Sequence, residues 1–123
     1  MAGRNYRDLI PWQKAMDLVV AVYDATKAFP MEERYGLTSQ LRRASVSVPS
    51  KSAEGQGRRR RTEFRRLLFI AHGSVREVET QLILSARLGF LPDVKANEVL
   101  GLSGEVGRLV TGLVQSLERD LQA

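Results

Sequence analysis

The stretch from Thr62 to Leu88, TEFRRLLFIAHGSVREVETQLILSARL, decides the fold of this chain. Residues suited to a core recur along it at alternating steps of three and four, the spacing of a helix packed in a bundle or coiled coil. This seam comprises Phe64, Leu68, Ala71, Val75, Val78, Leu82, Ser85 or Ala86, and Gly89. Further apolar side chains lie beside the seam, namely Leu67, Ile70, Ile83, Leu84 and Leu88. A helix of this length, about 40 Å at about 1.5 Å per residue, therefore needs more than one partner.

Three more helices are predicted around this one. Helical spacing of apolar residues runs from Trp12 to Thr26, from Leu37 to Val48 and from Val99 to Leu121. Pro30 ends the first of these helices, and the turn GFLPD precedes the last. No stretch of useful length alternates as a strand would. The chain is therefore predicted to be all-α, an antiparallel up-and-down four-helix bundle. We expect a single domain over residues 1–123, with residues 1–10 as a loosely ordered arm.

Pro49 interrupts the apolar pattern of the second helix. A proline inside a helix removes one backbone hydrogen bond and clashes with the preceding turn. The sequence therefore predicts a second helix that is kinked or broken between Ser45 and Pro49 and resumes through Lys51 to Glu54. The glycines of EGQG then favour a connection to the third helix.

The composition excludes several classes of protein. A hydrophobic fraction of 43% with 27% charged residues is typical of a soluble globular domain. No apolar run approaches the roughly 18 residues of a membrane span, and the N-terminal residues do not resemble a signal peptide, so we expect a cytoplasmic protein. The chain has no cysteine, which excludes disulfides and thiolate ligands, and His72 is its only histidine. We expect no metal and no cofactor.

Positive charge is concentrated between Arg42 and Arg66. This stretch holds nine basic side chains and two acidic ones, a local charge of +7, so the rest of the chain carries −2 of the net +5. Four of the arginines are consecutive and precede a helix, where they repel one another and oppose the helix dipole. An anionic partner would relieve this cost, whereas a solvated surface would not. The candidate nucleic-acid-binding residues are Arg42, Arg43, Lys51, Arg58, Arg59, Arg60, Arg61, Arg65 and Arg66.

No residues are arranged for catalysis. His72 lies beside the apolar seam, which favours a surface or interface role, and the serines of the second helix have no evident base. Glu54 and Glu63 flank the arginine run and are interpreted as internal partners of the arginines, not as an acid and base pair. We therefore expect no catalytic residues and no enzymatic activity; an enzyme acting on phosphate esters is the least favoured alternative.

Several short blocks together resemble a known family. They are Pro11-Trp12-Gln13-Lys14-Ala15, Phe29-Pro30, the run from Tyr35 to Ala44 (YGLTSQLRRA), Ala53-Glu54-Gly55, and Ala71-His72-Gly73-Ser74 with Glu77 and Gln81. The combination resembles the small bacterial four-helix-bundle proteins encoded by intervening sequences in large-subunit ribosomal RNA genes. The resemblance implies a homopentameric ring or barrel. It also implies kinship with the accessory variability determinant of diversity-generating retroelements, a basic pentamer that works with nucleic acid and a reverse transcriptase.

Two hypotheses for function remain. The first is a non-enzymatic, oligomeric helical bundle that binds RNA or DNA backbones through the nine basic residues. The second is a protein-protein adaptor whose arginines pair with an acidic partner such as a polymerase or reverse transcriptase. Apolar residues cover more of the third and fourth helices than a monomer of this size buries, so a homo-oligomer is expected in either case.

Overall fold

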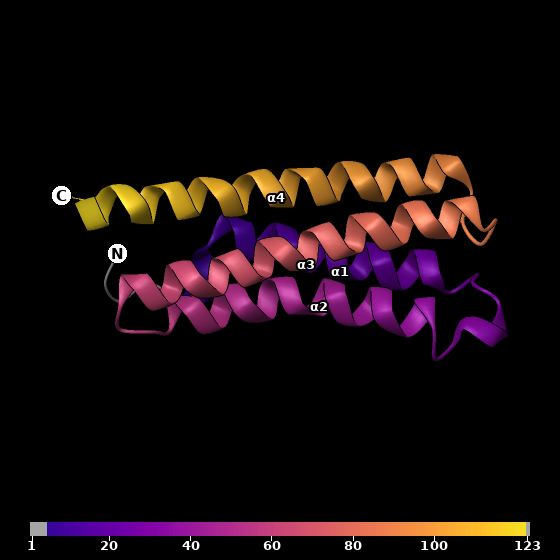
Figure 1. Cartoon of the computed structure of the whole chain (residues 1–123), viewed down its shortest axis with the longest axis horizontal. Coiled ribbons are helices and arrows are strands. Elements are labelled where there is room, and N and C mark those ends of the chain that lie inside the picture. The colour runs from indigo at the N-terminus through magenta and orange to yellow at the C-terminus, as the bar shows by residue number, and fades with distance from the viewer. Residues whose placement is uncertain (1–4, 123) are drawn as a thin grey trace.

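The structure is a computed structural model that describes residues 5–122, and it contains four α-helices (Figure 1). They are α1 (Ile10–Thr26), α2 (Leu37–Gln56), α3 (Arg61–Arg87) and α4 (Asp93–Gln122), with short 3-10 helices η1 (Tyr6–Asp8) and η2 (Met31–Glu33). No strand occurs within residues 5–122. The prediction of an all-α four-helix bundle is confirmed, and the observed α3 lies within one residue of the predicted range.

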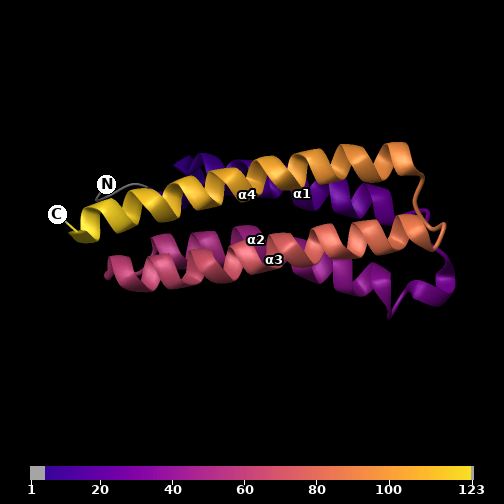
Figure 2. The same ribbon diagram turned by 45° about the horizontal axis from the view of Figure 1, so that its top comes forward.

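The four helices are arranged in a ring. Each helix packs against the next one, and α4 packs against α1, whereas no Cα atoms of the diagonal pairs α1–α3 and α2–α4 lie within 8 Å of each other among the described residues. The colour gradient runs in opposite directions along successive helices in both views (Figures 1 and 2). Two ion pairs join the start of one helix to the end of its neighbour, as opposite helix directions require. Arg61 at the start of α3 lies 2.6 Å from Asp120 near the end of α4, and Lys95 at the start of α4 lies 3.2 Å from Asp24 near the end of α1.

The predicted seam of α3 forms the centre of the core. Leu68, Val78 and Leu82 have no exposed surface, because α3 packs against both α2 and α4 along its length. Most of the apolar side chains that lie beside the seam remain exposed, including Ile70 and Leu84. A bundle of four helices therefore buries one face of α3 and leaves apolar surface outside.

Pro49 does not divide the second helix. α2 runs without interruption from Leu37 to Gln56, with Pro49 inside it, so the prediction of two helical segments is wrong. Proline in a helix interior costs about 3 kcal/mol. Here both halves of α2 are anchored in the core, through Leu41 before Pro49 and Ser52 after it, both without exposed surface, and this packing outweighs the local cost. A bend of the helix axis at Pro49 stays a prediction.

Gly55 lies inside α2 and not in the turn that follows. A Cβ atom at this position would lie 2.7 Å from Cδ1 of Phe64 and 3.3 Å from Cβ of Leu67, both on α3. Only a hydrogen atom fits there, so glycine permits the close approach of α2 and α3 just before their connection. The prediction that the glycines of EGQG belong to the connection is therefore wrong for Gly55.

The predicted N-terminal arm lies partly outside the described residues. Within it, residues 6–8 form η1, and the ring of Tyr6 contacts that of Trp12 edge-on at a centroid distance of 5.4 Å. None of the helices in the described part of the chain is both long enough and apolar enough to span a membrane.

Candidate nucleic-acid interface

The residues Arg58–Arg61, here called the arginine turn, lie between the end of α2 and the first residue of α3. Glu54 at the end of α2 accepts hydrogen bonds from Arg58 (2.9 Å) and Lys51 (3.2 Å). Glu63 in the first turn of α3 pairs with Arg66 at 2.9 Å. The prediction that Glu54 and Glu63 are internal partners of the basic residues is confirmed.

Two further carboxylates reach the arginine turn from α4. Asp120 pairs with Arg61 at 2.6 Å, and Glu118 lies 3.8 Å from a guanidinium nitrogen of Arg65. These residues are more than 50 positions away in the sequence, but the antiparallel packing of α3 and α4 brings them to the same end of the bundle. The local excess of positive charge is therefore smaller than the sequence alone suggests.

Arg59 and Arg60 differ from their neighbours. Both are exposed, and neither makes an ion pair with another residue in the range 5–122. Arg60 is the N-cap of α3, and its side chain makes no capping hydrogen bond. The first amide groups of a helix lack intrahelical acceptors and attract anions. Two uncompensated guanidinium groups thus lie beside an uncapped helix N-terminus.

The ion pairs around the arginine turn change the acidity of its carboxyl groups. Hydrogen bonds from Arg58 and Lys51 lower the pKa of Glu54, and a hydrogen bond from Arg66 lowers the pKa of Glu63. The same contact with Glu63 raises the pKa of Arg66. At neutral pH both carboxylates are therefore ionised, and each compensates nearby positive charge.

Arg42 and Arg43 lie at the opposite end of α2. Arg42 donates hydrogen bonds to the hydroxyl oxygen of Thr26 at 2.9 Å and to the backbone carbonyl of Tyr23 at 3.5 Å, and its guanidinium lies 4.5 Å from the centroid of the Tyr23 ring. Arg43 is exposed. Along α2, at about 1.5 Å per residue, Arg43 and Arg58 are about 22 Å apart. The nine predicted residues therefore do not form one patch.

A pocket between α1, α2 and the segment that connects them has a volume of about 520 Å³. This pocket is here called the α1–α2 pocket. The residues that line it include no carboxylate; they are Tyr23, Arg34, Tyr35, Thr38, Ser39, Arg42, Arg43 and Val46. Sequence reasoning included Arg42 and Arg43 but missed Arg34 and the two tyrosines. The signal available in the sequence was the polar row at steps of four, Thr38 with Arg42 and Ser39 with Arg43, next to an aromatic residue at position 35.

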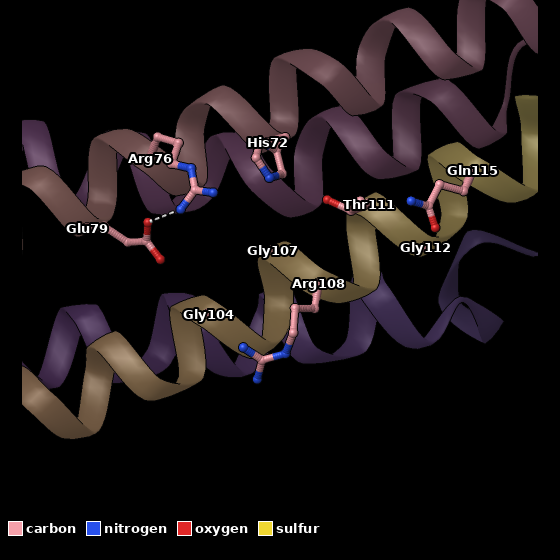
Figure 3. Close-up of a pocket in the computed structure, with 9 residues that line it drawn as sticks. All are labelled: His72, Arg76, Glu79, Gly104, Gly107, Arg108, Thr111, Gly112 and Gln115. Atoms are coloured by element: carbon pink, nitrogen blue, oxygen red, sulfur yellow. Dashed lines mark hydrogen bonds and ion pairs between the residues drawn. The ribbon is translucent and has the colours of Figure 1, made fainter.

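A second hollow of about 450 Å³ lies between α3 and α4 (Figure 3). His72 and Arg76 line it from α3, and Arg76 is paired with Glu79 at 2.8 Å. Glycines at three positions of α4 leave the space open; of these only Gly107 approaches α3, where an added Cβ would lie 3.5 Å from Val75. His72 is half-buried at this groove, beside the core seam. No group of three or more His, Cys, Asp or Glu side chains that could hold a metal ion occurs among the residues described.

Comparison with known proteins identifies the family. A model of the 23S rRNA-intervening sequence protein family matches residues 7–112, which is most of the chain. The chain belongs to this family. A crystal structure of a protein of unknown function from the S23 ribosomal protein family of Bacteroides thetaiotaomicron VPI-5482 is similar, with a TM-score of 0.77 and 18% sequence identity over 85% of this chain and 98% of that one. At this identity the similarity supports the fold alone. No curated protein matches the chain.

The resemblance to this family that was found from the sequence blocks is thus confirmed. Two of those blocks have a clear structural role in this chain. The Ala53-Glu54-Gly55 block supplies the carboxylate that pairs with Arg58 and the glycine against Phe64. The block from Tyr35 to Ala44 supplies most of the lining of the α1–α2 pocket.

Proposed function

We propose that this protein is a non-enzymatic, cytoplasmic nucleic-acid-binding protein that holds phosphate backbones at its arginine turn. The observation that carries the proposal is the pair Arg59 and Arg60, which are exposed, have no carboxylate partner within the described part of the chain, and lie beside the uncapped N-terminus of α3. Backbone phosphates are attracted both to guanidinium groups and to helix N-termini. The family name refers to 23S rRNA, which favours RNA as the nucleic acid.

The paired arginines support the same proposal. Arg58, Arg61 and Arg65 have half-exposed side chains, and their ion pairs with carboxylates lie at the surface. Exposed ion pairs contribute little free energy, typically about 0–1 kcal/mol. A phosphate can therefore replace a carboxylate as partner at small cost, so the turn can offer more contacts to a polyanion than its two unpaired arginines.

Salt titration tests the proposal. Each phosphate contact on duplex DNA contributes about −0.9 to the slope of log affinity against log salt concentration. Replacing Arg59 and Arg60 by Gln should make the slope less steep by about 2 and weaken binding to unrelated sequences equally. Arg87→Gln, at the far end of α3, is the matched control. A wild-type protein without salt-sensitive binding to RNA or DNA would reject the proposal in favour of the adaptor with an acidic protein partner.

We further propose that the protein forms a cyclic homo-oligomer, with five copies as the resemblance implies. Two exposed apolar faces support this: one on α1 with Met16 and Val20, and one on α3 with Phe69, Ile83 and Leu88. Because α1 and α3 are diagonal in the bundle, the two faces lie on opposite sides of the molecule. Contacts between different faces of neighbouring copies form a closed ring when the rotation from one copy to the next closes, and an open filament otherwise. Sedimentation as a monomer at micromolar concentration would contradict this proposal.

A further inference from the structure

The α1–α2 pocket combines features that the arginine turn lacks. It has a volume of about 520 Å³ and is lined by three arginines, two tyrosines and two hydroxyl-bearing side chains. Proteins that bind single-stranded nucleic acids stack bases on aromatic rings and contact the backbone with positive charge. Both components are present here within one pocket.

The positive charge of the pocket is uncompensated. Among residues 5–122, Arg42 donates to two neutral groups, the Thr26 hydroxyl and the Tyr23 carbonyl, and to no carboxylate, so its position is held while its charge remains. Arg34 and Arg43 are exposed and make no ion pair with any described residue. The pocket therefore attracts anions without having to displace a carboxylate.

The carboxylates next to the pocket residues in the sequence, Glu33 beside Arg34 and Asp24 beside Tyr23, interact with other groups. Glu33 accepts a hydrogen bond at 3.1 Å from the backbone N–H of Leu37, in the first turn of α2. Asp24 pairs with Lys95 on α4 at 3.2 Å. Neither residue lines the pocket, so neither competes with a phosphate for the arginines there.

The aromatic rings provide stacking surfaces. The side chain of Tyr35 is 87% exposed, and its only described ring contact is the guanidinium of Arg34, 5.6 Å from the ring centroid. An aromatic ring with this exposure contributes almost nothing to the core. Arg42 lies against the Tyr23 ring at 4.5 Å and presents a second flat, charged surface.

We infer that the α1–α2 pocket binds a nucleotide of a single-stranded nucleic acid, with the base stacked on Tyr35 and the backbone phosphate held by Arg34 and Arg43. Thr38 and Ser39 offer hydroxyl groups to the sugar or base. A base in a duplex is already stacked between its neighbours, so the pocket discriminates against duplexes. This site is about 22 Å from the arginine turn along α2, at about 1.5 Å per residue, and does not depend on the function proposed for that turn.

Fluorescence anisotropy with a labelled single-stranded hexauridylate and with an RNA duplex of the same length tests the inference. Tyr35→Ala should weaken binding of the single strand about tenfold, because loss of the stacking of one base on an aromatic ring lowers affinity by about this factor. Tyr35→Phe retains the ring and should stay within twofold of wild type. Duplex affinity should change less than twofold in both variants. Since Tyr35 is outside the core, circular dichroism should show the helical content of wild type.

Matched variants show whether the loss of binding arises at this pocket. Met31→Ala removes another exposed side chain from the same connection, outside the pocket, and should leave binding unchanged. The Tyr35→Ala loss should persist when Arg59 and Arg60 are Gln, which distinguishes the pocket from the arginine turn. Equal losses for single strand and duplex, equal losses for Tyr35→Phe and Tyr35→Ala, or no single-strand binding by wild type would each overturn the inference.

Discussion

The two ends of α2 carry positive charge in different ways. At the C-terminal end seven basic residues lie in or beside the arginine turn, and carboxylates from α2, α3 and α4 pair with five of them. At the N-terminal end the α1–α2 pocket has only three arginines, and no carboxylate lines it. The charge available to a ligand therefore depends on which acids the fold brings near, and not on the number of arginines in a stretch.

The supporting contacts differ as well. Arg42 is held by a hydroxyl, a carbonyl and an aromatic ring, all in α1. Arg58 and Arg66 are held by glutamates three or four residues away on their own helices or turn. Removal of Arg42 thus disturbs helix packing, whereas removal of Arg58 disturbs only a surface pair.

The largest expected effect comes from the α2–α3 contact that supports the arginine turn. Gly55→Val would place side-chain atoms where a Cβ alone already lies 2.7 Å from Phe64. Overpacking of this kind costs about 1–3 kcal/mol, so the free energy of unfolding in urea should fall by about 2 kcal/mol. The control is Gly112→Val, where no atom lies within 4 Å of the added Cβ. Equal stability of the two variants would contradict the close approach of α2 and α3.

A smaller effect on the free energy of unfolding should distinguish the two ends of α2. Arg42→Gln loses a hydrogen bond to Thr26 and the contact with the Tyr23 ring, which together are worth about 1–2 kcal/mol. Arg58→Gln loses a surface pair and should leave the urea midpoint unchanged. A larger shift of the urea midpoint for Arg58→Gln than for Arg42→Gln, measured at the same protein concentration, would contradict the stronger support assigned to Arg42.

Removal of the carboxylates at the arginine turn should increase its affinity for nucleic acid. In the double variant Glu54→Gln and Glu63→Gln, Lys51, Arg58 and Arg66 no longer have an acidic partner on their own segment. We expect duplex RNA to bind several-fold more tightly and the salt dependence to become steeper. The matched control is Glu32→Gln, which removes an exposed carboxylate far from the turn. Unchanged affinity in the double variant would show that the paired arginines do not contact the ligand.

The smallest expected effect is a dependence on pH. The lowered pKa values of Glu54 and Glu63 mean that their ion pairs contribute stability above the ordinary value of 4.5, and that this contribution is lost as the pH falls through the lowered values. Protonation releases the same basic side chains. The difference in affinity between wild type and the double variant should therefore be constant near neutral pH and vanish only as the pH falls through the lowered pKa values of the two carboxyl groups. A constant difference across this range would contradict the role of the two carboxylates.

Much of the fold could be predicted from local patterns. The seam from Phe64 to Gly89 predicts α3 because every third or fourth side chain of a helix lies on one face. Glu54 and Glu63 could be assigned to the arginines because residues three or four apart on a helix are neighbours. The break predicted at Pro49 is wrong because only the local cost of a proline in a helix is visible in the sequence. The packing that offsets this cost is visible only in the structure.

The sequence by itself therefore determined the four helices, their family and the clustering of arginines along one stretch. The tertiary structure alone decided which of those arginines are free. Asp120 reaches Arg61 only because α3 and α4 are antiparallel, and Tyr23 reaches Arg42 only because α1 packs against α2. Helix periodicity is a property of neighbouring residues, whereas charge compensation depends on distances in space, and those distances are set when the apolar faces of the four helices pack together.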